Sequence, residues 1–297
     1  MIIAIGSIAL DTTRTPFKTV KDVLGGSATY FSLASSFFYK TGLVGVVGDD
    51  FPKEYHQILN DRLDLTGLKT EKGKTFRFDS SFSYDLSKRT TNKTELNVFE
   101  KFDPILPDNY KNAEYVYLGN IDPEQQLKVL NQINKPKLTV CDTIELWIKT
   151  KRDKLIEVMS RVDGVVLNDD EVRLLCKTSN LVNGAKMILN WGAKFVIIKK
   201  GEHGAIMFSP TTIFPSPGYP LEEVVDTTGA GDSFAGGFMG HLAHSEKIND
   251  KTIKEAVIYG NVMGSFAVED FSINKLLTLT MDDINSRYKK YREMVTF

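Results

Sequence analysis

The chain has 297 residues, of which 42% are hydrophobic and 25% charged, so it is long and apolar enough to bury a large core. Its net charge of −1 excludes the strongly basic surface that attracts nucleic acids and anionic membranes. Two isolated cysteines, Cys141 and Cys176, argue against a disulfide framework or a zinc site, and no apolar run reaches the ~18 residues of a membrane-spanning helix. We therefore expect a cytoplasmic protein with neither a nucleic-acid nor a membrane partner.

Short apolar runs recur along the chain and predict strands that are buried on both faces. They lie at residues 2–6, 42–48, 114–119, 137–141, 163–168 and 194–199. Amphipathic helical patterns separate several of these runs, at residues 122–134, 149–162 and 180–192. Strands that alternate with helices favour βαβ units and a parallel sheet. No repeat or linker divides the sequence, so we predict a single α/β domain over residues 1–297.

A pair of glycines, Gly25 and Gly26, leads into a predicted helix within residues 24–39. The first turns of this helix carry small residues, which allow a ligand to approach closely and to meet free N–H groups. A plain turn from strand to helix explains the same residues equally well.

Residues 76–84 depart from the βα rhythm. Aromatic residues at every second or fourth position alternate with polar ones, which is typical of a half-buried antiparallel strand: Phe76, Phe78, Phe82 and Tyr84. Residues 94–99 and 13–20 predict two weaker strands.

We expect these strands, from about residues 12–22 and 74–102, to form a small β-sheet lid on the main domain. Its apolar face must cover a ligand site, a partner subunit or the body of the same chain. We predict a homodimer through the lid, with the other two coverings as alternatives.

Polar residues follow two of the predicted strands. Asn168 and Glu171 begin a helix with i, i+3 spacing, where acids also stabilise the helix N-terminus. A magnesium site keeps several waters and needs few protein ligands, so this pair is also a candidate site. Lys199 and Gly201 end the next strand, at the edge where open α/β sheets bind ligands, although a surface turn is the alternative.

The stretch "DTTGAGDSF" at residues 226–234 carries the clearest chemistry. A helix is predicted from about residue 231 to 243, and Gly229, Ala230 and Gly231 leave the N–H groups at its start uncovered. Together with the helix dipole, these groups form an anion hole. Asp232 lies in the same turn, where it can accept a proton from a hydroxyl. An anion hole beside a carboxylate suits phosphoryl transfer better than simple binding.

The chain resembles sugar kinases of the PfkB/ribokinase family. The resemblance covers nearly the whole chain and is carried by residues 226–238, 25–34, 168–171 and 199–205. It implies a Rossmann-like, three-layer α/β sandwich with a mostly parallel central sheet and a β-sheet lid. It also implies ATP-dependent phosphorylation of a hydroxymethyl group.

The resemblance assigns a role to each candidate residue. It implies that Asp232 is the general base, that Gly229, Ala230 and Gly231 form the anion hole, and that Asn168 and Glu171 organise Mg²⁺ through waters. Lys199 and Gly201 would lie near the ATP phosphates and Asn261 near the adenine. Asp11, at the end of the first strand, would hold acceptor hydroxyls with Gly25 and Gly26. Asp226 and Thr228 would bind a monovalent cation such as K⁺.

The acceptor itself stays open. Many sugar-specific members of the family have Asn where this chain has Tyr30, and Asp142 and Glu145 are further candidate acceptor contacts. A sugar or polyol is the first interpretation, and a nucleoside is the alternative. A binding protein without catalytic activity is a third hypothesis, which the intact Asp232 argues against.

Overall fold

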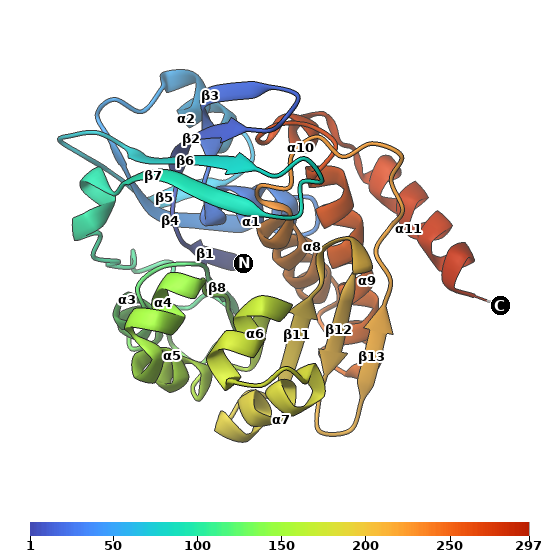
Figure 1. Cartoon of the computed structure of the whole chain (residues 1–297). Helices are drawn as coiled ribbons and strands as arrows, with labels where there is room; N and C mark the ends of the chain where they lie inside the picture. The colour runs from blue at the N-terminus through green and yellow to red at the C-terminus, as the bar shows by residue number, and fades with distance from the viewer. Residues whose placement is uncertain (297) are drawn as a thin grey trace.

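The apolar runs form the larger of two sheets in the computed structural model, which describes residues 1–296 (Figure 1). Its strand order is β13-β12-β11-β10-β9-β8-β1-β4-β5, and only β12 and β13 run antiparallel to their neighbours. The strands are β1 (Ile2–Ile5), β4 (Thr41–Gly48), β5 (Asp64–Glu71), β8 (Tyr115–Leu118), β9 (Leu138–Cys141), β10 (Gly164–Asn168), β11 (Phe195–Lys199), β12 (Ala205–Phe208) and β13 (Ile213–Ser216). The predicted, mostly parallel sheet is thereby confirmed.

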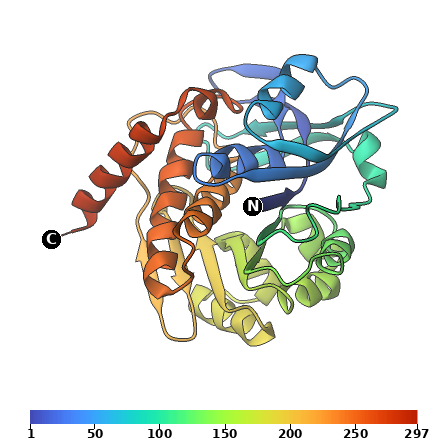
Figure 2. The ribbon, with the colours of Figure 1, turned by 180° about the vertical axis from the view of Figure 1, so that it is seen from behind.

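Helices cover both faces of this sheet (Figures 1 and 2). One face carries α3 (Pro123–Leu130), α5 (Arg152–Met159), α6 (Asp169–Cys176) and α7 (Leu181–Trp191), and the other carries α1 (Ser27–Ser36), α8 (Ala230–Ser245) and α9 (Asp250–Ala267). In β1, Ile3 and Ile5 join the first core, whereas Ile2 and Ala4 join the second. Successive side chains of a strand point to opposite faces, so one buried strand serves two cores. This is the predicted three-layer sandwich.

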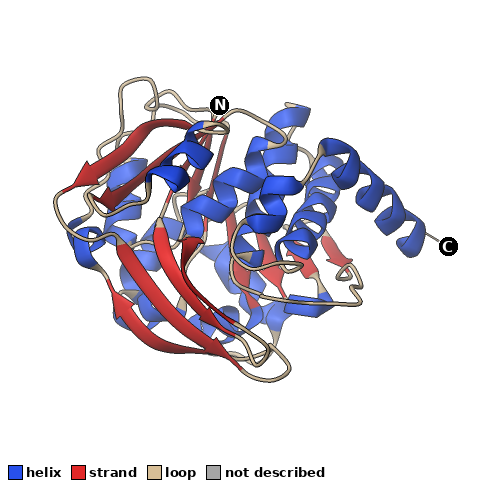
Figure 3. Cartoon of the chain, turned by 90° about the horizontal axis from the view of Figure 1, so that it is seen from above, coloured by secondary structure: helices blue, strands red, loops and turns tan. Residues whose placement is uncertain are grey.

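The remaining helices lie at the margins of the sandwich. They are α2 (Lys53–Asn60), α4 (Glu145–Thr150), α10 (Asn274–Thr278), α11 (Met281–Val295) and the 3₁₀ turns η1 (Asn97–Lys101) and η2 (Gly201–His203). Figure 3 shows α11 extending outward from the other helices at the C-terminus. Within residues 1–296, none of the helices combines the length and hydropathy that crossing a membrane requires.

Two predicted helices differ from the observed ones. The helix predicted for residues 122–134 ends at Leu130, and the one predicted for residues 149–162 is divided between α4 and α5. The division falls at Lys151, whose φ of −136° and ψ of 36° are not helical. The amphipathic pattern continued across this break because both helices pack on the same core.

A second sheet of four strands lies apart from the first and is called the lid sheet below (Figure 1). Its order is β3-β2-β6-β7, with β2 (Ala9–Arg14), β3 (Thr19–Gly25), β6 (Phe76–Phe82) and β7 (Arg89–Glu95). The strand predicted at residues 76–84 is confirmed as β6. It pairs antiparallel with β7, as predicted, but parallel with β2.

The two weaker strand predictions are wrong in their bounds. Residues 94–99 contain only the end of β7, and the chain then turns into η1. β7 is polar and almost wholly exposed, so it carries no apolar alternation for a sequence to reveal. Residues 13–20 contain the tight turn between β2 and β3, which is closed by a hydrogen bond from Thr15 N to Lys18 O at 2.9 Å.

Part of the apolar face of the lid sheet packs on the body of the same chain. The ring of Phe76 stacks on Phe99 of η1, with ring centroids 5.3 Å apart. Phe99 packs in turn on the core beneath α3 and α5. This part of the lid sheet therefore covers the body of its own chain, which was one of the three coverings considered from the sequence.

Candidate active site

The N-terminus of α8 begins at a glycine that no other residue can replace without strain. Gly229 caps the helix in the left-handed conformation, with a φ of 75°. A Cβ on Gly229 would also lie 2.3 Å from Cγ of Tyr30, so the Tyr30 ring packs directly on this turn. The first N–H groups of a helix have no partner inside it, and here Ala230 N reaches only Thr227 O at 3.3 Å. The turn therefore offers partial positive charge.

Asp232 lies in this first turn and is partly buried. Burial and the nearby charge of Asp142 raise the pKa of the Asp232 carboxyl to about 7, against the opposing effect of Lys199. The Tyr117 hydroxyl lies 3.5 Å from Asp232 Oδ1, a long hydrogen bond. A pKa near neutrality is the value that suits a general base.

A buried ion pair lies beside Asp232. Lys199, at the end of β11, donates from Nζ to Asp142 Oδ2 at 2.8 Å. A Cβ on Gly231 would lie 2.9 Å from Lys199 Nζ, so the ammonium group also reaches the start of α8. Burial lowers the pKa of Lys199, but the surrounding carboxylates outweigh it and raise the pKa above its ordinary value. The lysine therefore stays charged.

Asn168 and Glu171 form a capping box at the start of α6. Glu171 N donates to Asn168 Oδ1 and Asn168 N donates to Glu171 Oε2, both at 2.8 Å. The helix-stabilising reading of this pair is therefore correct, and it does not exclude a binding role. Burial and the charge of Asp142 raise the pKa of Glu171 to about 8, so a cation nearby would be favourable.

Asp11 is placed differently from the prediction. It lies within β2 of the lid sheet rather than at the end of the first strand, because the chain leaves the large sheet after Ile5. A Cβ on Gly25 would lie 1.9 Å from Asp11 Oδ2, which explains the glycine there. Burial, with Asp226 and Asp232 nearby, raises the pKa of Asp11 to about 7. Gly26 adopts a φ of 98°, and a Cβ on Gly26 would lie 2.4 Å from Ser7 O.

Asp226 and Thr228 form a compact turn just before α8. Thr228 N donates to Asp226 Oδ1 at 2.9 Å. Within residues 1–296, Asp226 Oδ2 and Thr228 Oγ1 are buried without a hydrogen-bond partner, as is Asp11 Oδ1. Burial raises the pKa of Asp226. Buried oxygens without partners are costly, so this turn suits a bound cation or a hydroxyl group.

Three predicted residues lie outside this cluster of carboxylates. Glu145 is exposed and forms a surface ion pair with Lys149 of its own helix. Gly201 is exposed in η2, and nothing lies within 4 Å of a Cβ built on it. Asn261 is buried on α9, where its Nδ2 donates to Ser216 Oγ at 2.9 Å.

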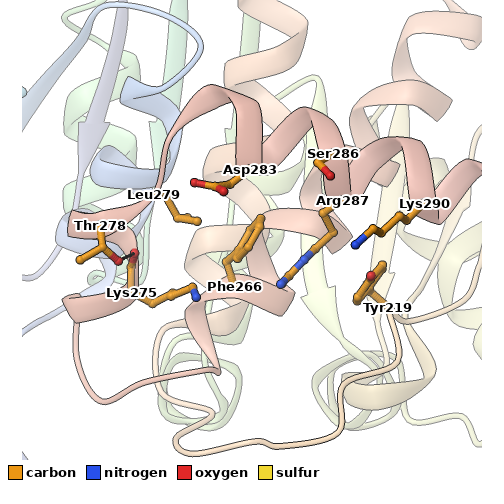
Figure 4. Close-up of a pocket in the computed structure, with 9 residues that line it drawn as sticks. All are labelled: Tyr219, Phe266, Lys275, Thr278, Leu279, Asp283, Ser286, Arg287 and Lys290. Carbon is orange, nitrogen blue, oxygen red and sulfur yellow. Dashed lines mark hydrogen bonds between the residues drawn. The ribbon is translucent and has the colours of Figure 1, made fainter.

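A cavity of about 270 Å³ lies between α9, α10, α11 and the segment that carries Tyr219 (Figure 4). It contains none of the predicted site residues. Arg287 crosses it, 3.4 Å from the ring centroid of Phe266 and 4.9 Å from that of Tyr219. Arg287 Nη1 also donates to Ser265 Oγ at 3.0 Å, one helical turn beyond Asn261. The cavity thus borders the region predicted for adenine.

Two residues that face the carboxylates were missed by sequence reasoning. Tyr117 lies in an apolar strand run, where its hydroxyl gives no signal, yet it lies 3.4 Å from Asp142 Oδ2 and stacks on Phe31. Arg89 opens β7, and its charge partly opposes the rise in the pKa of Asp11 and Asp232. Neither residue belongs to a local motif.

Comparisons with known proteins show which family and which relatives the chain is similar to. Residues 2–278 match the family described as pfkB family carbohydrate kinase. A cytidine kinase from Thermococcus kodakarensis is 32% identical over 255 residues, which cover 84% of this chain and 91% of that protein.

Two solved structures share the fold. A nucleoside kinase from Methanocaldococcus jannaschii aligns with a TM-score of 0.78 at 20% identity, over 97% of this chain and 98% of that one. A protein described as a ribokinase II from E. coli, in complex with ATP and Mg²⁺, aligns with a TM-score of 0.80 at 20% identity, over 97% and 99%. At this level of identity the likeness concerns the fold alone.

Proposed function

Because the chain belongs to the pfkB family of carbohydrate kinases, we propose that Asp232 and the N-terminus of α8 transfer a phosphoryl group from ATP to a hydroxymethyl group. The protein is a phosphotransferase that uses ATP and acts on a sugar-like acceptor. One observation carries the assignment of residues. The Asp232 carboxyl, with a pKa of about 7, lies in the first turn of a helix capped by Gly229 in the left-handed conformation, and the Lys199 ammonium group reaches the same turn at Gly231.

The transfer needs a base on one side of the reacting oxygen and positive charge on the other. Asp232 takes the proton of the acceptor hydroxyl while that oxygen forms a bond to the γ-phosphorus. The bond from this phosphorus to the oxygen of ADP breaks, and the proton leaves Asp232 afterwards. The N–H groups at residues 229–231 and the Lys199 ammonium group stabilise the negative charge on the phosphoryl oxygens.

Asn168 and Glu171 are the residues we expect to hold Mg²⁺ through waters, and the metal would neutralise phosphate charge. The raised pKa of Glu171 supports the fit, because a cation would stabilise its ionised form. Asp226 Oδ2 and Thr228 Oγ1 are the oxygens that we propose for K⁺. We propose that Gly201, in η2, lies near the ATP phosphates and that Asn261, on α9, lies near the adenine.

We favour a nucleoside as the acceptor, and a free sugar or polyol is the second candidate. The Thermococcus kodakarensis relative is a cytidine kinase and matches most of both chains. Asp11 Oδ1 is buried without a partner within residues 1–296, so it can accept hydrogen bonds from ribose hydroxyls. Gly25 leaves room for the Asp11 carboxylate, and the Tyr30 ring packs on Gly229. Glu145 is exposed and paired with Lys149, so its position suits an acceptor contact less well.

We also propose a homodimer through the lid sheet and a cytoplasmic location. Phe17 and Tyr84 at the edge of the lid are 66% and 80% exposed, so they offer an apolar contact to a second copy. Cys141 and Cys176 are buried free thiols, which suits a reducing compartment.

An acceptor panel tests the proposed function. Purified protein with ATP and Mg²⁺ is incubated with cytidine, uridine, adenosine, ribose, fructose and inositol, and ADP release and product mass are measured. We expect one nucleoside to give the highest kcat/KM. A phosphorylated free sugar as the best product would replace the nucleoside assignment. No product from any acceptor, with ligands still raising the Tm, would overturn the kinase assignment in favour of a binding protein.

A further inference from the structure

The lid sheet contains three arginines, and they do not lie on the same face. Strand register pairs Asp11 with Phe78 and Phe82 with Arg89. Residues opposite one another in register share a face, so these four belong to one side of the sheet. Arg14 and Arg77 occupy the alternate positions and lie on the other side.

The side that holds Arg89 faces the active site. Asp11 lies on this side and is buried. Ser80, two residues after Phe78 on β6, lies on the same side and is also buried. The Arg89 guanidinium lies over the ring of Phe78, with Cζ 5.3 Å from the ring centroid. Phe78 is the register partner of Asp11, so Arg89 stands beside the carboxylate proposed to hold the acceptor.

The other two arginines are held by acids, and Arg89 is not. Arg14 donates to both oxygens of Asp79, at 3.0 and 2.8 Å. Arg77 pairs with Asp22 and with Asp50. For Arg89, residues 1–296 supply neither a hydrogen bond nor an ion pair to the side chain, which leaves its five donors available.

The charges around Arg89 indicate what it would bind. The site is rich in carboxylates, and its other cation, Lys199, is already paired with Asp142. Arg89 is close enough for its charge to oppose the rise in the pKa of Asp11, Asp226 and Asp232. A phosphoryl group that enters this acidic site needs a further cation, and the planar guanidinium fits its oxygens with paired hydrogen bonds.

We propose that Arg89 binds phosphoryl oxygens during the reaction and completes, from the lid sheet, the anion-binding surface that α8 begins. This inference rests on the proposed function. The oxygens belong to the transferred phosphoryl group or to a phosphate on the acceptor, and the experiment below separates the two sources. The long, exposed side chain of Arg89 needs only to leave the Phe78 ring to reach them.

Arg89→Gln and Arg89→Lys test the proposal, with Lys88→Gln as the matched control. Lys88 is the exposed neighbour, and its removal changes the net charge equally. We expect Arg89→Gln to lower kcat with a neutral acceptor by roughly 10- to 100-fold, the value of one or two charge-assisted hydrogen bonds. Arg89→Lys should be intermediate, and Lys88→Gln and the Tm of all variants should match wild type.

A binding measurement separates contact with phosphoryl oxygens from a structural effect. Titration calorimetry with MgADP, with and without aluminium fluoride, is done in the presence of acceptor. We expect Arg89→Gln to bind MgADP as wild type does but to lose about tenfold of the affinity that aluminium fluoride adds.

The kinetic and binding results together show which phosphoryl oxygens, if any, Arg89 binds. Unchanged kcat with neutral acceptors, together with a raised KM for acceptors that carry a phosphate, assigns Arg89 to the acceptor phosphate. Wild-type kinetics and wild-type aluminium fluoride binding in Arg89→Gln overturn the proposal while leaving the kinase assignment intact. A wild-type protein that phosphorylates no acceptor removes the proposed function itself.

Discussion

The N-terminus of α8 and the lid sheet approach the same carboxylates, yet the two regions are built from different material. α8 is buried from Ser233 to Gly240, and beside it Lys199 and Asp142 form a largely buried pair. In β7 of the lid sheet, six of the seven residues are exposed, so few buried contacts hold this strand. Segments with few buried contacts open more easily than packed ones. Asp232 and Lys199 thus lie on a rigid support, whereas Arg89, on β7, lies on a softer one.

The first prediction concerns the rigid region, where the substitution Asp232→Asn removes the proposed general base. We expect Asp232→Asn to lower kcat by roughly 10²–10⁴-fold, because the amide cannot take the acceptor proton. MgADP binding should change little, since the backbone of the α8 turn is unaltered. In wild type, kcat should rise as the pH increases through about 7, where the Asp232 carboxyl loses its proton. A variant with the wild-type kcat would remove Asp232 from its role.

The second prediction compares one ion pair from each region. The Lys199 and Asp142 side chains are 16% and 7% exposed, against 42% and 24% for Arg14 and Asp79 in the lid sheet. We expect Lys199→Met to lower the free energy of unfolding by about 3–5 kcal/mol, because it leaves Asp142 buried and unpaired. Arg14→Met should cost less than about 1 kcal/mol.

Denaturant unfolding of both variants measures this difference. Asp142→Asn in the Lys199→Met background should restore part of the lost stability, since it removes the stranded charge. Equal losses in the two single variants would contradict the contrast between a rigid and a soft side.

The third prediction concerns pH and the carboxyl that joins the two regions. Burial and the neighbouring carboxylates raise the pKa of Asp11 to about 7, against about 3.9 for an aspartate in an unfolded chain. Between these values the folded protein binds this proton more tightly than the unfolded chain does. The free energy of unfolding therefore falls as the pH rises from about 4 to about 7. Asp11→Asn should match wild type near pH 4 and exceed its Tm by at least about 2 °C at pH 8.

Asp79→Asn is the matched control for that experiment. Hydrogen bonds from Arg14 lower the pKa of Asp79, so this carboxylate stabilises the fold at neutral pH and loses the effect in acid. We expect Asp79→Asn to reduce the Tm at pH 8, opposite in sign to Asp11→Asn. If Asp11→Asn also lowers the Tm at pH 8, the Asp11 charge is better accommodated than its burial indicates.

The same division separates what the sequence could predict from what it could not. The turn at Gly229 and the capping box at Asn168 depend on neighbours in the chain, so local patterns were sufficient for both. Tyr117 and Arg89 reach the site through strand register over long separations, and local patterns carry no record of that. β7 is polar on both faces, so neither its bounds nor the orientation of Arg89 followed from alternation.

The last and smallest effect concerns the outer edge of the lid sheet. Phe76 is covered by Phe99 and Phe78 by Arg89, so the apolar surface left for a second copy lies at Phe17 and Tyr84. Their rings touch, with centroids 5.8 Å apart, which joins the β2–β3 turn to the segment after β6. A dimer formed there would stiffen the soft side without touching the reacting groups.

We therefore expect wild type to be a dimer in light scattering, and Phe17→Ser with Tyr84→Ser to shift it towards monomer. The kcat should change less than about threefold, because the two substitutions leave Asp232, Lys199 and Arg89 in place, whereas KM for the acceptor should rise as the lid becomes more mobile. If the wild type is a monomer, the rings of Phe17 and Tyr84 contact only each other within the lid and form no contact with a second copy. In that case the stiffness of the lid comes from its surface ion pairs, and the effect on KM would appear in Arg14→Met instead.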